Sequence, residues 1–164
     1  PLWRALLLMR NDLRFFGPAG ATQDPHRAAT NWVLGASYEV PIADNDSITF
    51  ALEYFHNDLG YTDTVNYPFV LLGGGYQPFH LSRHYGMFMI YLPEPGHWND
   101  VTFTLSNIVN LSDGSALTRV DTLFELMDDL DLNLAFGVHF GKDTGELRLG
   151  GQLVDIAARL MIQF

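Results

Sequence analysis

The stretch Leu130–Phe140 reads LDLNLAFGVHF and alternates strictly between two kinds of side chain. Its even positions are all leucine, phenylalanine or valine, whereas its odd positions carry Asp131, Asn133 and His139 among small residues. Successive side chains of a β-strand point to opposite faces, so this period of two predicts a strand with one apolar and one polar face. The stretch Val154–Phe164, VDIAARLMIQF, repeats the pattern with apolar residues at every even position.

Further segments with strand character precede these two, which gives about eight strands in a single domain over residues 1–164. One of them, His84–Leu92, is apolar at both parities, and its register stays ambiguous. The other segments alternate clearly. The preceding strands are expected over Met9–Phe15, Trp32–Val40, Ile48–Tyr54, His84–Leu92, Val101–Asn110 and Arg119–Leu126.

Charge is segregated between the two parities. No Asp, Glu, Lys or Arg falls on the apolar parity of the expected strands, as a bilayer demands, because a lipid-facing charge at mid-membrane costs roughly 2–4 kcal/mol. The core of a soluble sandwich also excludes charge, so alternation alone leaves lipid and protein interior as alternatives. The residues expected on the polar parity are Arg10, Asp12, Arg14, Glu39, Glu53, Arg119, Asp121, Glu125, Asp131, His139, Asp155 and Arg159.

Strand length and aromatic placement favour the membrane. The segments are close to the 9–11 residues that a tilted strand needs to cross a bilayer. Aromatic side chains lie near strand ends on the apolar parity, as in the two interfacial girdles of membrane barrels. The expected girdle residues are Phe15, Trp32, Tyr54 and Phe140 at one end, and Tyr38 and Phe164 at the other.

Connection lengths also alternate, as they do in outer-membrane barrels with long outer loops and tight periplasmic turns. The exception is Ser112–Ser115, a short turn where a long loop is allowed. The most unusual connection is Asn57–Arg83, which is too apolar for a solvated loop. It is expected either to fold inward as a constriction or pack on a partner, or to form further strand. The long connections are Gly17–Thr30, Asn57–Arg83 and Gly141–Gln152, and the short ones are Ala43–Asp46, Pro93–Gly96 and Asp128–Asp129.

Composition excludes several classes of protein. The 164 residues carry a net charge of −10, which argues against a nucleic-acid partner, and the absence of cysteine excludes disulfides and thiolate metal sites. No apolar window of about 18 residues predicts a transmembrane helix. The chain begins at Pro1 without a visible signal peptide, so we expect a processed chain or part of a longer protein.

A chain that ends in an amphipathic strand closed by Phe164 resembles bacterial outer-membrane β-barrel proteins. Two further stretches are similar to the C-terminal part of larger porin-like proteins, in which an Asn-Leu-x-Asp-Gly-Ser turn precedes closing hairpin strands. They are YQPFHLSRHYGMFMIYLPEPG (76–96) and NIVNLSDGSALTRVDTLFELMDDLDLNLAFGVHFG (107–141). The resemblance implies an outer-membrane location and more strands before this region. It also implies that Phe164 is an assembly signal for the barrel-assembly machinery.

We therefore expect an antiparallel transmembrane up-and-down β-barrel that passes small hydrophilic solutes or ions. The polar parity would line its lumen and the apolar parity would meet lipid, with a homo-oligomer or larger outer-membrane complex as a possible assembly. If eight strands close on themselves, side chains fill the interior. The alternatives are a non-transporting wall component or anchor, an outer-membrane lipid-modifying enzyme, and a soluble binder whose apolar parity points inward.

Catalytic and metal motifs are poor, so no enzyme, cofactor or metal is expected. His80 and His84 would lie roughly 13 Å apart on a strand, too far to share a metal. Ser115 near Asp113 lacks a Gly-x-Ser-x-Gly nucleophile turn. His139 is expected to face the lumen with Asp131 and Asp121 near it, but such a His–Asp pair inside a barrel is more often structural than catalytic.

Overall fold

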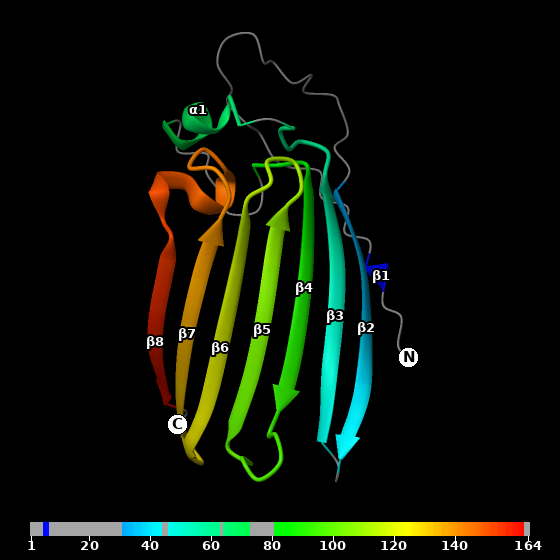
Figure 1. Cartoon of the computed structure of the whole chain (residues 1–164), viewed down its shortest axis with the longest axis vertical. Helices are drawn as coiled ribbons and strands as arrows, with labels where there is room; N and C mark the ends of the chain where they lie inside the picture. The colour runs from blue at the N-terminus through cyan, green and yellow to red at the C-terminus, as the bar shows by residue number, and fades with distance from the viewer. Residues whose placement is uncertain (1–4, 7–30, 44–45, 63, 73–80, 163–164) are drawn as a thin grey trace.

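The protein is described by a computed structural model over residues 5–6, 31–43, 46–62, 64–72 and 81–162. These residues form one antiparallel sheet in which each strand pairs with the next along the chain (Figure 1). The prediction of an all-β, up-and-down fold is confirmed. The elements are β1 (Ala5–Leu6), β2 (Asn31–Ala43), β3 (Asp46–Asn57), α1 (Tyr67–Leu72), β4 (His84–Pro93), β5 (Val101–Asn110), β6 (Ala116–Met127), β7 (Leu130–Phe140), η1 (Glu146–Gly151) and β8 (Val154–Ile162).

The strand register brings all the expected apolar parities onto one face of the sheet. Directly opposed partners share a face, and the pairs Leu34↔Tyr54, Leu105↔Val120 and Leu132↔Leu160 are typical. The register also resolves β4, whose even positions join this face. We call it the apolar face. It comprises the even positions of β2 (32–40), β3 (48–56), β4 (84–92), β6 (116–124), β7 (130–140) and β8 (154–162), and the odd positions of β5 (101–109).

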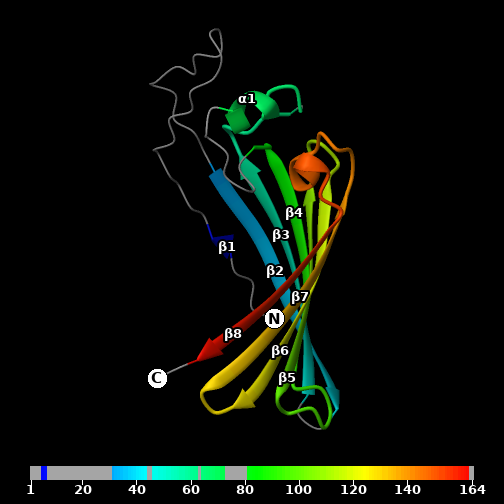
Figure 2. The same ribbon diagram turned by 90° about the vertical axis from the view of Figure 1, so that its left-hand side faces the viewer.

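The apolar face is free of Asp, Glu, Lys and Arg across seven strands. Its side chains are exposed or partly exposed and none of them is buried, because no second layer covers this face within the described part of the chain (Figure 2). Leu34 is 58% exposed, Leu52 62% and Ile156 78%. In the described ranges, the buried hydrophobic residues are instead Tyr67, Val70, Leu81, Tyr85, Ala135 and Leu147.

Short turns and long loops occupy opposite ends of the sheet. Residues 44–45, 94–100 and Asp128–Asp129 connect strands at one end, which we call the turn end. Residues 58–83, 111–115 and 141–153 connect them at the other, the loop end, where α1 and η1 lie (Figure 1). The predicted alternation is confirmed for these connections except at residues 111–115, where the short turn around Ser112–Ser115 is the exception that the sequence predicted. Gly17–Thr30 lies outside the described residues.

The described sheet is open rather than a closed barrel. Each terminal strand of the described sheet pairs with one neighbour only: β8 pairs with β7, and β1 pairs with β2. Closure within this chain is therefore not confirmed, and neither is the closed cup of a soluble binder. The expected first strand over Met9–Phe15 lies outside the described residues. No helix among the residues described is long and apolar enough to cross a membrane.

Candidate functional site

The opposite face of the sheet, which we call the polar face, gathers the expected lumen residues. Arg10, Asp12 and Arg14 lie outside the described residues. The other expected residues share the polar face, where they are linked by cross-strand pairs such as Glu125↔Asp131. These residues are Glu39, Glu53, Arg119, Asp121, Glu125, Asp131, His139, Asp155 and Arg159.

Two ion pairs order the β6–β8 part of the polar face. The Arg119 guanidinium donates from Nε and Nη2 to the two carboxylate oxygens of Asp121, both at 2.9 Å. Nε2 of His139 lies 3.0 Å from Oδ2 of Asp155. Gly137 makes room for this pair, because a Cβ there would lie 2.0 Å from the same Asp155 oxygen. The partner of His139 is therefore Asp155, and not Asp131 or Asp121, which the sequence analysis placed near it.

Negative charge dominates the described polar face of the strands. It carries six carboxylates and two arginines, and Arg119 is already paired with Asp121. Glu125 and Asp131 lie directly opposite each other near the turn end, in a hollow of about 410 Å³ that Asp100 and Asp128 also line. Like charges that lie directly opposite each other destabilise a sheet, and contact with water and salt weakens their repulsion. Such a pair is therefore tolerated where both carboxylates are in water. The arrangement is typical of a water-facing surface.

An apolar hollow interrupts the polar face closer to the loop end. It has a volume of about 300 Å³, and its lining includes Glu53, Phe55, Tyr85 and Met87. Phe55 and Tyr85 stack across β3 and β4 with ring centroids 5.8 Å apart. Sequence reasoning missed this hollow because β4 is apolar at both parities.

A buried polar network closes the loop end of the polar face. Asn57, Ser82, Asn110, Ser115 and Glu146 are each at most 2% exposed. Asn57, Tyr85 and Asn110 are polar-face residues at strand ends, so the long loops fold over that face and not over the apolar one. We call this network, together with Tyr67, Leu81, Tyr85 and Asp113, the loop cluster.

The Asn-Leu-Ser-Asp-Gly-Ser turn is the centre of the loop cluster. Asn110 Oδ1 accepts the backbone N–H of Ser112 at 3.0 Å, an Asx turn, and Gly114 takes the positive φ of 74° that the turn requires. Asp113 Oδ1 accepts the backbone N–H of Ser115 at 2.7 Å, and Oδ2 accepts that of Glu146 at 2.8 Å. A short turn therefore fixes the start of η1, which lies 33 residues away from Asp113.

Glu146 connects η1 to the strand ends. Its carboxylate accepts hydrogen bonds from the Tyr85 hydroxyl, from Asn110 Nδ2 at 2.9 Å and from the backbone N–H of Leu81 at 3.4 Å. A buried carboxylate is tolerated when donors satisfy it in this way. Sequence analysis did not find Glu146, because nothing in its local pattern distinguishes it from a solvated loop residue.

Described residues of the Asn57–Arg83 connection pack together at the loop end. Tyr67, Val70 and Leu81 form a small buried cluster, against which Tyr61 and Leu149 pack. The strand-pair alternative is wrong for the described part, which holds α1 and a single bridge between Tyr61 and Ser82.

Tyr67 anchors this connection to the loop cluster. Its hydroxyl bonds Ser82 Oγ and donates to Asp113 Oδ2 at 3.1 Å. Burial, reinforced by the Asp113 charge, raises the pKa of Tyr67 to about 12, whereas its hydrogen bond with Ser82 acts in the opposite direction. The hydroxyl is therefore protonated at neutral pH.

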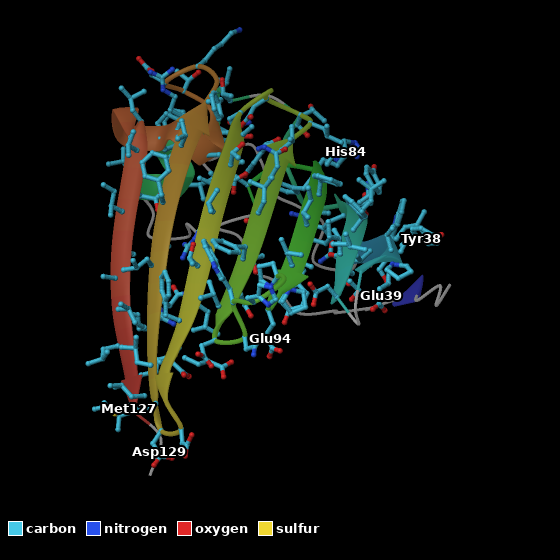
Figure 3. The ribbon with its side chains drawn as sticks, turned by 60° about the horizontal axis from the view of Figure 1, so that its bottom comes forward. Tyr38, Glu39, His84, Glu94, Met127 and Asp129 are labelled. Atoms are coloured by element: carbon cyan, nitrogen blue, oxygen red, sulfur yellow. The ribbon has the colours of Figure 1, made fainter. Side chains whose placement is uncertain are left out.

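Aromatic rings gather on the apolar face at the loop end, where the sequence placed a girdle. Trp32 and Tyr54 lie with ring centroids 5.1 Å apart, and Trp32 stacks on His56 at 5.5 Å. Phe140, 50% exposed, ends β7 at the same end. Figure 3 labels His84 at this end and Glu94, Met127 and Asp129 at the turn end.

The girdle expected at the turn end is only partly described. Tyr38 opposes Phe50 and is exposed, whereas Phe164 lies outside the described residues. Trp98, in the β4–β5 connection, packs near Phe103 with ring centroids 6.0 Å apart. It is an aromatic residue of this end that sequence analysis did not select.

The other chemistry that the described residues offer is limited. Among them, no group of three or more His, Cys, Asp or Glu side chains is placed to hold a metal ion. Both ring nitrogens of His139 are occupied, Nδ1 by the Leu147 carbonyl and Nε2 by Asp155, and Ser115 Oγ donates to Asp113 at 2.6 Å. This geometry lends no support to a nucleophilic site at Ser115.

Comparisons of the chain with protein-family models, with curated proteins and with solved structures find no match. The resemblance to porin-like proteins therefore stays a prediction, and the function is argued from the two faces of the sheet and the loop cluster.

Proposed function

We propose that the chain is a wall segment of a bacterial outer-membrane β-barrel channel, with the apolar face in lipid and the polar face toward an aqueous lumen. The observation that carries the proposal is the uncharged, exposed apolar face across seven strands. Soluble monomers rarely expose contiguous apolar patches larger than a few hundred Å². A hydrocarbon environment satisfies this face without any second protein layer.

The backbone supports the same conclusion. Every described long strand has 9 to 13 residues, which suits a tilted crossing of the bilayer. Backbone groups in lipid must all be hydrogen-bonded, so an open sheet edge cannot remain in the membrane. We infer that further strands, from a longer chain or from other copies, complete the wall beyond β8 and β2.

The charges of the polar face determine the ion preference of the proposed channel. Six carboxylates against two arginines favour cations in the lumen, although bulk water and salt screen much of that preference. The loop cluster narrows the lumen at its outer end, since the buried parts of the long loops fold over the polar face. The solutes that suit such a path are small, hydrophilic and neutral or cationic.

The loop cluster also favours one alternative, a non-transporting barrel that serves as an anchor or wall component. Buried groups from three connections cover the strand ends, as they would in a plugged barrel. Conductance separates the two functions: the channel is expected to produce discrete current steps in a planar bilayer, whereas a plugged barrel passes no ions at high protein load.

Single-cysteine labelling tests the orientation of the faces. The chain has no cysteine, so each variant carries one reactive thiol. Leu134→Cys is on the apolar face and Asn133→Cys is its neighbour on the polar face. In proteoliposomes, a lipid-soluble maleimide is expected to label position 134, and a water-soluble one position 133. The reverse pattern, or a protein that stays monodisperse without detergent, would overturn the proposal.

A further inference from the structure

Two histidines from different strands face each other at the loop end of the apolar face. His56 is near the end of β3, His84 begins β4, and the register places them directly opposite. Their Nδ1 atoms lie 3.5 Å apart, and their ring centroids 5.1 Å. Sequence reasoning tested His84 against His80 and could not anticipate His56, which is 28 residues away.

This separation suits a shared metal ion better than a hydrogen bond. A distance of 3.5 Å is beyond the 2.7–3.2 Å range of good hydrogen bonds that nitrogen donates. A metal about 2.1 Å from both nitrogens would span that distance with an N–metal–N angle of roughly 113°, close to tetrahedral. The two imidazoles are thus spaced as the ligands of one ion.

The surroundings hold the pair in place. Trp32 stacks on the His56 ring, and the Tyr54 hydroxyl hydrogen-bonds His84 Nδ1 at 2.6 Å, a bond that an ion bound to this nitrogen replaces. The His84 backbone is fixed on both sides, because its N–H donates to Ser112 Oγ at 3.2 Å and its carbonyl accepts the N–H of Leu111 at 2.9 Å. Ligands that are already ordered lose little entropy when an ion binds.

We propose that His56 and His84 form a two-imidazole site for a divalent transition-metal ion, with water completing the coordination. Imidazole suits Zn²⁺, Ni²⁺ and Cu²⁺, and Cu²⁺ binds most tightly of the three. Two protein nitrogens leave coordination positions open, so the ion exchanges with solution rather than acting as a permanent structural metal. The site does not depend on the channel function, because it lies on the opposite face of the sheet from the lumen.

Metal titration of the full chain in detergent micelles tests the site. Electron paramagnetic resonance of Cu²⁺ is expected to show one ion per chain with two equivalent nitrogen ligands. Calorimetry with Zn²⁺ gives the affinity. Trp32 fluorescence should be quenched by Cu²⁺, since its ring stacks on His56.

Variants decide whether this pair is responsible. His56→Gln and His84→Gln should each weaken binding by more than tenfold, since even second-shell partners of a metal contribute 10–100-fold. The matched control is His97→Gln, in the β4–β5 connection at the turn end, which should bind like the parent. Far-UV circular dichroism confirms the fold of each variant, and His56→Gln alone carries the test if His84→Gln does not fold. Parent-like affinity in His56→Gln, or no binding of Cu²⁺ or Zn²⁺ by the parent, would overturn the proposal.

Discussion

An arginine at Leu52 separates a lipid-facing surface from a water-facing one. Leu52 lies in the middle of β3 on the apolar face and is 62% exposed. If water covered this face, Leu52→Arg would change the free energy of unfolding by no more than about 0.5 kcal/mol, as at ordinary surface positions. In the bilayer, the same arginine near mid-membrane costs about 2–4 kcal/mol. The two environments therefore differ by about 1.5–4 kcal/mol, which is about 10- to 700-fold in the folding equilibrium constant.

The structure supplies two matched controls. Ser37→Arg adds the same side chain on the polar face, one position along β2 from Ala36, the partner of Leu52. Its cost should be close to zero, because the lumen is wet and acidic. Leu34→Arg is on the apolar face but near the loop end, where the cost falls to about 0–1 kcal/mol.

Equilibrium unfolding in guanidinium chloride measures these differences after refolding into lipid vesicles. Tryptophan fluorescence reports the transition, and the order of stability should be Ser37→Arg, Leu34→Arg, then Leu52→Arg. If Leu52→Arg and Ser37→Arg agree within 0.5 kcal/mol, the size of an ordinary surface effect, the apolar face does not meet lipid.

Further predictions concern the loop cluster and the lumen. Gly60→Ala should destabilise the 57–83 connection by about 1–3 kcal/mol, because its Cβ would lie 2.0 Å from the Ser82 carbonyl oxygen; unchanged limited proteolysis would contradict this. Asn110→Ala removes the amide that donates to the carboxylates of Asp113 and Glu146, and it should lower the free energy of unfolding by about 1–3 kcal/mol. A parent-like melting temperature would show that these hydrogen bonds do not stabilise the loop cluster. Glu53→Gln should shift the reversal potential in a KCl gradient toward zero, and an unchanged potential would argue against an acidic lumen. The pKa of Tyr67 is raised to about 12, so its contribution to the free energy of unfolding is complete below the ordinary pKa of 10 and is lost as the pH rises from 10 to 12. Tyr67→Phe should abolish this loss of stability at alkaline pH, which tyrosinate absorbance and limited proteolysis measure.

Much of the sheet could be predicted from local pattern. The alternation in Leu130–Phe140 and Val154–Ile162 gave both the strands and their faces, and the register confirms the faces. The turns at Asp128–Asp129 and Ser112–Ser115 could also be predicted from the sequence, because turn residues favour a turn through their own backbone conformation and local hydrogen bonds. The predicted barrel is confirmed only as an antiparallel up-and-down sheet, which is not closed among the described residues, since closure depends on which strands meet at the edges.

The loop cluster and the histidine pair could not be predicted in the same way. Asn110 and Glu146 are 36 residues apart, and His56 and His84 are 28 apart. Nothing in the local sequence of either pair indicates its partner. The apolar hollow around Met87 was also hidden, because β4 has no clear polar parity of its own.

The sequence by itself determined which side chains share a face, because the direction of a side chain alternates with every residue of a strand and needs no knowledge of its neighbours. Only the tertiary structure decided the register, the folding of the long loops over the polar face and the meeting of His56 with His84. These features depend on pairing between distant segments, whose choice reflects the summed packing and hydrogen bonding of whole strands rather than any local pattern.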